Sequence, residues 1–280
     1  MRPTHPSAAH WRPQRRRLLQ SAAWTSLGLG LAGTGWADED PTGGDPLGSM
    51  QWPLIRDAYM GAGKAYRFSP DVVVTGPPFA EDAMNVPVMV DARPLLAQGR
   101  KVERIEVAVD RNPIPHVLTY YPERAWPVLA FRFRMEQGSP VRAMVHTDDG
   151  QWWVGHTWVD AAGGGCTVPG ATRKDGSWSR TLNQVQAKLF NSVLQGQGTR
   201  LRVRVMHPMD TGLVSGIPSF HLEDLVIRDD QEQNLARLEM HEPISENPLL
   251  TFELGTQVQG AVHISGRDNN GNTFFQEVGA

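Results

Sequence analysis

The sequence predicts an all-β protein built from two β-sandwiches that are joined by a short helical linker. The 280 residues include 28 glycines and 21 prolines, which is above the usual share and indicates many turns. Several short runs alternate apolar and polar residues with the period of two that is typical of half-buried strands. Long runs with helical spacing are few. With 40% hydrophobic and 20% charged residues, the chain is expected to be globular rather than disordered.

The first sandwich is expected over residues 71–170. Its clearest strands are 105–109 and 129–135, where apolar residues occupy every second position. Turn signals such as Asn112-Pro113 separate these strands from weaker ones. About seven short strands in roughly 100 residues is the density of a β-sandwich.

The helical linker is predicted over residues 171–198 and the second sandwich over residues 199–280. In the linker, apolar residues recur at spacings of three to four, namely Trp178, Leu182, Val185, Leu189 and Val193. The second sandwich opens with apolar residues that alternate with arginines from Arg200 to Val205. Near its end, Asn270-Gly271 is typical of a hairpin turn.

Residues 1–37 have the pattern of a twin-arginine signal peptide. Arg15-Arg16-Arg17-Leu18-Leu19 precedes a mildly apolar stretch, and Gly35-Trp36-Ala37 has the small residues of a cleavage site. The apolar stretch is too short and too polar for an uncleaved anchor. We therefore expect export to the periplasm and no membrane span after cleavage. The leader that follows, residues 38–70, is expected to be loose over Asp38–Ser49 and to hold a possible short helix at Trp52–Met60.

Net charge and cysteine usage exclude several classes of function. Residues 1–37 hold five of the 27 basic residues and none of the 30 acidic ones, so the mature chain has 22 against 30, a net charge of −8. Such a surface repels phosphate backbones, and nucleic acid is therefore not an expected partner. One cysteine excludes a disulfide framework and a multi-cysteine metal site.

Cys166 is the candidate functional residue. It directly follows Gly163, Gly164 and Gly165, outside any periodic apolar run. Three glycines are costly to order, so the sequence predicts an exposed, mobile arm whose thiol makes few packing contacts. Such a thiol suits the carrying of a group between sites better than catalysis, which needs a fixed base. An incidental loop cysteine is the alternative.

Other candidates have plainer interpretations. His146 and His156 fall in predicted strands, where a hydrogen-bonded histidine is commoner than a metal ligand. His207-Pro208-Met209 could form a soft metal site or the end of a strand that turns at a proline. Three tryptophans could form a binding platform or pack in the core, namely Trp152, Trp153 and Trp158. No metal and no catalytic group is predicted.

Motifs in both halves resemble the sulfur-oxidation carrier proteins SoxY and SoxZ, here in one chain. The SoxY-like motifs include Pro77–Asp82, Asn112–Pro115 and the Gly-Gly-Cys ending at Cys166. The SoxZ-like motifs are Leu201–Val205, His207-Pro208-Met209-Asp210-Thr211-Gly212, Ile217-Pro218, Ser245-Glu246-Asn247-Pro248 and Asp268–Gly271. In particular, the chain resembles the fused SoxYZ-like carriers that are associated with quinoprotein dehydrogenases.

This resemblance implies Ig-like β-sandwiches without catalytic activity. It implies that Cys166 carries a sulfur-containing adduct, which a haem enzyme attaches from thiosulfate and from which a hydrolase releases sulfate. It also implies that the two halves pair with each other. Unlike the family pattern, in which the chain ends soon after the cysteine, Thr167-Val168-Pro169 follow and tether the arm at both ends. The alternative function is a non-covalent accessory module for a periplasmic quinoprotein dehydrogenase, with Cys166 incidental.

Overall fold

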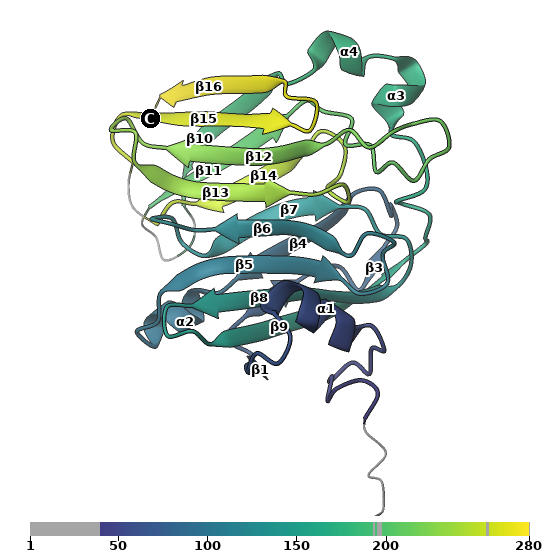
Figure 1. Ribbon diagram of the computed structural model, residues 1–280. Helices are drawn as coiled ribbons and strands as arrows, with labels where there is room; N and C mark the ends of the chain where they lie inside the picture. Colours follow the sequence, from purple (N-terminus) through teal and green to yellow (C-terminus); the bar gives the residue numbers. More distant parts are fainter. Residues whose placement is uncertain (1–39, 193, 195–197, 256–257, 280) are drawn as a thin grey trace, which may run out of the picture. The chain divides into compact units, whose positions relative to one another are not determined.

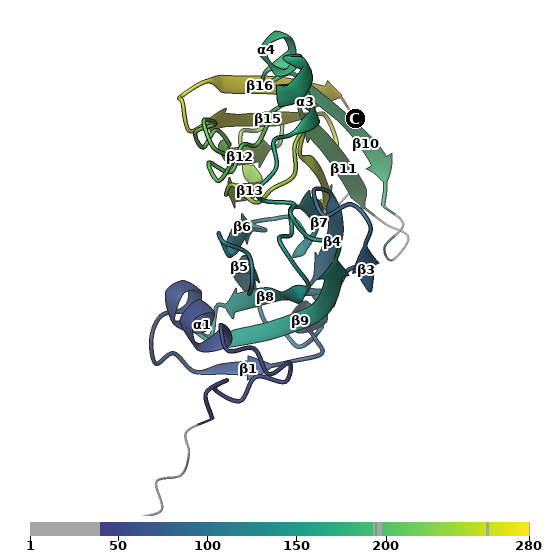
Figure 2. The ribbon, with the colours of Figure 1, turned by 90° about the vertical axis from the view of Figure 1, so that its right-hand side faces the viewer.

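Two β-sheets stacked face to face form the protein, as the computed structural model shows for residues 40–279 except 193, 195–197 and 256–257 (Figures 1 and 2). The larger sheet has the order β1 (Tyr66–Phe68), β9 (Trp152–Ala161), β8 (Ser139–Thr147), β5 (Val102–Val109), β6 (His116–Tyr121), β13 (Asn234–Met240), β12 (Leu222–Arg228), β15 (Ala261–Asp268) and β16 (Thr273–Gly279), and β3 (Phe79–Ala80) also pairs with β9. The smaller sheet has the order β10 (Val185–Asn191), β11 (Thr199–Val205), β14 (Leu249–Glu253), β7 (Val128–Phe133), β4 (Val86–Asp91) and β2 (Val73–Thr75). The all-β sandwich class is confirmed.

The two halves of the chain share both sheets. In the larger sheet, β6 of the first half pairs antiparallel with β13 of the second, and in the smaller sheet β7 pairs with β14. One hydrophobic core therefore runs through both halves, from Phe131 to Leu238 and Val203. Separated halves would expose two pairs of strand edges, which are prone to pair with other chains. The predicted pairing of the two sandwiches is thus achieved by edge-to-edge continuation of their sheets.

The predicted helical linker is wrong over much of its length. Only α3 (Ala171–Asp175) and α4 (Trp178–Thr181) are helical, and Val185–Asn191 is strand β10, which pairs along its length with β11. A spacing of four residues, as between Val185 and Leu189, places side chains on one side of a strand as well as of a helix. Val193 lies outside the described residues.

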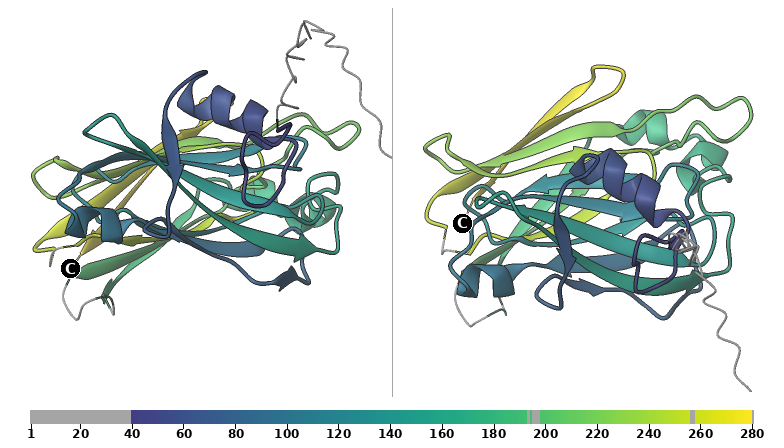
Figure 3. Two further views of the ribbon diagram at one scale, coloured as in Figure 1. Left: turned by 90° about the horizontal axis from the view of Figure 1, so that it is seen from below. Right: turned by 60° about the horizontal axis from the view of Figure 1, so that its bottom comes forward.

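The leader is packed rather than loose. The helix α1 (Trp52–Met60) is confirmed, and it lies on the outer face of the larger sheet (Figure 3). There a second apolar cluster forms between the helix and strands β5, β8 and β9, with Trp52, Ile55, Met60, Ala108, Met144, Trp152 and Val154. The short helix α2 (Arg93–Ala97) lies elsewhere, between β4 and β5. The predicted signal peptide, residues 1–37, lies outside the described residues.

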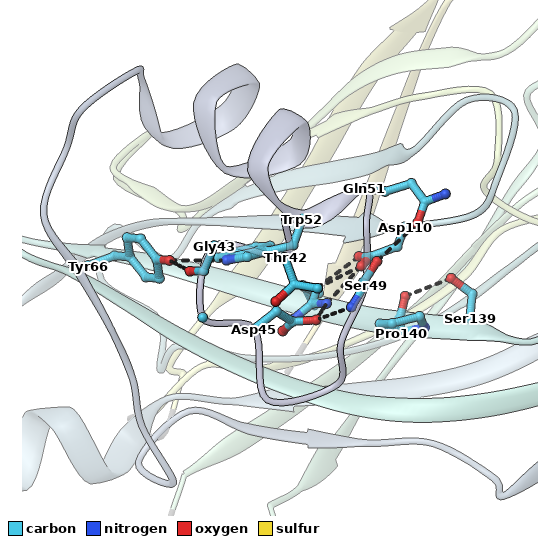
Figure 4. A network of polar contacts seen from close by, with 12 residues as sticks. Thr42, Gly43, Asp45, Ser49, Gln51, Trp52, Tyr66, Asp110, Ser139 and Pro140 are labelled. Carbon is cyan, nitrogen blue, oxygen red and sulfur yellow. Dashed lines mark hydrogen bonds and ion pairs between the residues drawn. The ribbon is translucent and has the colours of Figure 1, made fainter. Parts of the chain in front are cut away.

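A buried ion cluster holds the segment before α1 against the sheet (Figure 4). Arg142 of β8 contacts Asp45 at 2.7 Å and Asp110 at 2.7 Å, and all three side chains are inaccessible to solvent. The guanidinium carbon of Arg142 also lies 4.5 Å from the centre of the Trp52 ring. The expectation of a loose Asp38–Ser49 is therefore wrong from Asp45 on, because Asp45 neutralises a charge that the sheet presents. We call residues 40–60 the strap.

Among the described residues, no helix is both long and apolar enough to cross a membrane.

Candidate functional site

The segment between β9 and α3, residues 162–170, carries the candidate cysteine and is called the arm. Gly163 and Gly164 have φ angles of +94° and +77°, which a side chain adopts only with strain. The Gly165 amide then donates to the Met135 carbonyl at 2.9 Å. A Cβ on Gly165 would lie only 2.1 Å from the Ala83 carbonyl oxygen. The glycines therefore let the arm approach the body of the protein closely.

Cys166 is buried, with 1% of its surface exposed. Its amide donates to the Glu136 carboxylate at 3.1 Å, and its carbonyl accepts a hydrogen bond of 2.7 Å from the Thr211 hydroxyl. Its thiol lies 3.6 Å from the Arg134 carbonyl oxygen. The prediction of an exposed arm whose thiol makes few contacts is therefore wrong. The glycines were interpreted as freedom of the backbone, whereas here they allow the arm to dock.

The docked thiol is a poor nucleophile. Burial raises the pKa of Cys166, the nearby Glu136 carboxylate raises it further, and Arg134 only partly opposes them, so that the pKa is about 12. The thiolate rather than the thiol is the reactive form of cysteine. In this arrangement Cys166 stays protonated at neutral pH and is protected from reaction.

Arg134 forms the floor beneath the arm and joins it to the second half of the chain. Its guanidinium donates to the Val168 carbonyl of the arm at 3.2 Å and to the Met209 carbonyl of the second half at 3.2 Å. Only 1% of Arg134 is exposed, and its Nε atom has no hydrogen-bond partner among the described residues. Burial lowers the pKa of this arginine, although Glu246 and other nearby acidic groups oppose the effect.

The second half contributes two loops to the docking site. Thr211 binds the Cys166 carbonyl, and the neighbouring Asp210 carboxylate forms an ion pair with Arg173 of α3 at 2.6 Å. Glu246 accepts hydrogen bonds from the Thr172 amide at 3.2 and 3.3 Å. These loops are the His207–Gly212 and Ser245–Pro248 motifs. They converge on the arm, so the docking site exists only when both halves are joined.

Family comparisons match the same division of the chain. Residues 56–166 match the family model described as "Sulfur oxidation protein SoxY", and residues 187–279 match "Sulphur oxidation protein SoxZ". The chain belongs to the SoxY and SoxZ families, fused in one polypeptide. SoxY and SoxZ are carrier and accessory proteins of the Sox system, so this fusion is a carrier protein of sulfur oxidation and not an enzyme.

Solved structures with a partial likeness include two that align with about two fifths of this chain. The sulfur carrier protein SoxY from Chlorobium limicola f thiosulfatophilum is 19% identical, with a TM-score of 0.33, over 39% of this chain and 90% of that one. A superoxide reductase (neelaredoxin) from Ignicoccus hospitalis is 12% identical, with a TM-score of 0.27, over 39% of this chain and 91% of that one. Among curated proteins, none matches the chain.

His207 and Met209 of the SoxZ part form a structural turn. The Nδ1 atom of His207 accepts a hydrogen bond of 3.1 Å from the Met209 amide, and the Met209 sulfur accepts one of 3.3 Å from the Leu222 amide. Burial lowers the pKa of His207 to about 4, although Asp268 opposes the effect, and the ring is neutral at pH 7. Both candidate soft ligands are thus used to shape the loop that carries Thr211.

The remaining candidates are packed into the fold. Trp152 and Trp153 point to opposite faces of β9 and pack in the outer and the central apolar clusters, respectively. Trp158 is partly exposed, with the Arg111 guanidinium 4.9 Å from its ring centre. His146 contacts Glu103 at 2.8 Å, and burial lowers the pKa of His156. In the part of the chain that the structure describes, no three His, Cys, Asp or Glu residues are grouped to hold a metal ion.

Sequence reasoning missed Arg134 and Glu136, which hold the arm from the SoxY part. Arg134 is a polar position of the predicted alternation 129–135 and Glu136 directly follows it, and charged residues at such positions are usually solvated. The one available signal was Asn112 in the Asn-Pro motif, because its side chain binds the Arg134 carbonyl at 2.8 Å and the Glu136 amide at 2.9 Å. That motif therefore shapes the loop on which the arm docks.

Proposed function

We propose that this SoxY–SoxZ fusion carries a sulfur adduct covalently on Cys166 and presents it after the arm leaves its docking site. The observation that supports the proposal best is the end of the SoxY match at Cys166, in the glycine-flanked arm. In this arm the thiol is the only fully buried side chain, since Thr167 and Val168 beside it are exposed. The arm thus has one functional group to hide or to present.

Release of the arm requires less free energy than unfolding. The hydrogen bonds of the Gly164 and Gly165 amides and of Thr211 each contribute about 1 kcal/mol net. The bonds of the arm to the charged Glu136 and Arg134 side chains contribute about 1.5–3 kcal/mol each. Burial of one small side chain adds a similar amount. Opening breaks only these contacts, whereas global unfolding breaks both sheets and the core as well, so a small fraction of otherwise folded molecules presents the thiol.

The reactions on Cys166 balance when partner enzymes supply the oxidation and the hydrolysis. In the undocked arm the thiol loses its proton, and its sulfur forms a disulfide bond with the terminal sulfur of thiosulfate, while two electrons pass to a haem enzyme. A hydrolase then adds water across the bond between the outer sulfur and the sulfonate group. This releases sulfate and leaves a persulfide on Cys166. We place these steps in the periplasm, in keeping with the twin-arginine pattern of residues 1–37.

Intact-mass analysis tests the carrier role. Protein isolated rapidly from its own cells, with its thiols trapped, should show several masses on the Cys166 peptide that collapse to the free thiol on reduction. The Cys166→Ser variant, prepared in parallel, should show one mass. A single free-thiol mass in the wild-type protein would contradict covalent carrying.

Burial of Cys166 favours a second candidate, a non-covalent accessory role beside a quinoprotein dehydrogenase. A thiol that is 1% exposed and has a pKa of about 12 would then be a packing residue. Complementation of a deletion strain with Cys166→Ala separates the two functions. Full rescue supports the accessory role, and loss of rescue by a variant that folds normally supports the carrier.

A further inference from the structure

The outer face of the smaller sheet presents four cations with no acidic partner. Lys188 of β10 lies opposite Arg202 of β11, with Arg204 two residues along and Arg132 on β7 across the seam between the halves. All four side chains are exposed. None forms an ion pair with any residue that the structure describes, whereas Arg200 and Arg93 nearby each pair with an acid. We call these four residues the basic face.

Two acids on this side of the sheet are paired with other arginines, and a third, Glu246, lines a hollow with Arg132 and Arg204 without an ion pair to either. Glu253 of β14 binds Arg200, and Asp91 of β4 binds Arg93 at 2.6 Å. The four cations and the Glu246 carboxylate together leave an excess of three positive charges here, on a chain whose formal net charge is −3. Charge of one sign that is gathered on one face of an oppositely charged protein steers a complementary surface toward that face.

An apolar groove runs beside these cations. It has a volume of about 450 Å³, and its lining residues from both halves include Pro77, Pro87, Met89, Ala130, Leu249 and Thr251. A smaller hollow of about 170 Å³ continues it between Arg132 and Arg204. The larger sheet, by contrast, has its outer face covered by α1 in the first half (Figures 2 and 3). No described element covers the groove in the same way.

We infer that the basic face and its groove dock the acidic surface of a partner protein, with an apolar side chain of that partner in the groove. Arginine is enriched in protein interfaces, and an apolar recess rimmed by charge is typical of a docking site. A recess receives a projecting side chain, whereas a membrane surface offers none. The exposed Phe190 does not project as an anchor, because the Lys188 ammonium and the Arg202 guanidinium lie 5.3 and 5.6 Å from its ring centre.

The position of this face relates it to the arm. Glu246 lines the smaller hollow beside Arg204, and the same carboxylate binds the Thr172 amide just after the arm. A partner bound to the basic face would therefore lie next to the base of the arm. The inference requires no chemistry at Cys166 and holds equally for a carrier and for an accessory module.

Site-specific photo-cross-linking in the native cells tests this surface. p-Benzoylphenylalanine replaces Gln186, which is exposed on the same face, and the control position is Arg67 in β1. The protein captured at position 186 is then purified, and its affinity for the full chain is measured directly. We expect an acidic protein whose affinity falls at least tenfold in the Arg202→Glu/Arg204→Glu variant and falls with added salt.

The control variant Lys64→Glu/Lys101→Glu makes the same change in net charge at exposed positions away from this face and should keep the affinity within about twofold. Cys166→Ala should bind like the wild type, which separates this inference from the proposed carrier role. Absence of a cross-link above the control, a partner without acidic character, or equal loss in both charge variants would overturn the inference. So would binding of the chain to phosphatidylglycerol vesicles that is lost in Arg202→Glu/Arg204→Glu, because the face would then be a membrane surface.

Discussion

The sequence predicts the arm and the first part of the strap, up to Ser49, to be loose, but both segments are docked, and by different forces. The strap is held by its buried Trp52 and by Asp45, which forms an ion pair with Arg142 of the sheet. Asp110 pairs with the same arginine, and all three charged side chains are inaccessible to solvent. The arm is held through its backbone, by Arg134, Glu136 and Thr211, with one small buried side chain. Breaking the first leaves buried charges, whereas breaking the second exposes groups that water can satisfy.

This difference separates a structural segment from a releasable one. A buried ion pair that loses one partner destabilises a protein strongly, because the remaining charge stays desolvated. The hydrogen bonds of the arm are formed by its backbone, and when the arm leaves, both the backbone and the groups that bound it gain access to water, so that the bonds are exchanged for bonds to water. The arm can therefore open while the strap stays in place, which is the property a carrier segment needs.

The largest effect is expected for the strap. Arg142→Met should lower the free energy of unfolding by about 3–5 kcal/mol, because two buried carboxylates lose their counter-ion. Urea unfolding at pH 7 measures this change. Arg267→Met, which removes an exposed arginine with acidic neighbours, is the control and should cost less than about 1 kcal/mol. Equal losses would mean that the cluster is not the anchor.

The same cluster predicts the response to acid. Burial alone raises the pKa of Asp45, but hydrogen bonds from Arg142 and from the Ser49 amide outweigh it and hold the pKa below the usual 3.8. The stability that Asp45 contributes is therefore complete above pH 3.8 and is lost as the pH falls through its lower folded value. Urea midpoints between pH 5 and pH 2.5 should show this loss in the wild type and a smaller one in Arg142→Met.

The next effect is expected at the arm. In Gly165→Ala the new Cβ would meet the Ala83 and Met135 carbonyl oxygens at 2.1 and 2.5 Å, so the arm must leave its site. We expect a loss of about 1–3 kcal/mol and alkylation of Cys166 at least tenfold faster than in the wild type. Gly279→Ala, where a Cβ meets nothing within 4 Å, is the control. Unchanged alkylation would show that the arm is not docked in solution.

A smaller effect is expected when the hydroxyl that binds the Cys166 carbonyl is removed. Thr211→Val keeps the shape of the side chain but removes the donor to the Cys166 carbonyl, together with the acceptor of a longer bond of 3.3 Å from the Leu213 amide, at a cost of about 0.5–1.5 kcal/mol for each bond. Because the bond to the Cys166 carbonyl forms only in the docked state, alkylation of Cys166 should accelerate by the factor that corresponds to the free energy of this bond. Thr273→Val, exposed in β16, should change neither quantity. A loss of stability without faster alkylation would show that the Thr211 hydroxyl does not control release of the arm.

The smallest effect is expected from alkaline pH. The folded Cys166 stays protonated up to a pKa of about 12, whereas the free thiol ionises near 9.0. The unfolded state thus binds fewer protons between these values, and stability falls as pH rises above 9.0. By pH 9.5 the loss should be about 1 kcal/mol or less, and Cys166→Ala should lack this part of the slope. Identical slopes in the two proteins would mean that the thiol ionises freely in the fold.

Local patterns in the sequence determined the fold class, the strands 105–109 and 129–135 and the helix Trp52–Met60, because these follow from the alternation and spacing of neighbouring side chains. The second of these strands ends at Phe133, two residues before its predicted end. The family motifs likewise identified Cys166 and the Thr211 and Glu246 loops. A spacing of four residues does not distinguish a helix from a strand at Val185 and Leu189. Only the pairing with β11 makes this segment a strand.

Tertiary structure alone decided what the glycines do and where the charges lie. A glycine at position 165 allows either a mobile backbone or a close approach of the backbone to another segment. Which of the two occurs depends on the Ala83 and Met135 carbonyls, which are distant in sequence. Asp45 and Arg142 are separated by 97 positions, and neither residue indicates the other. Backbone contacts and buried ion pairs of this kind arise only when the sheets bring remote segments together. From composition alone, glycine-rich segments and charged residues are therefore expected to lie in solvent.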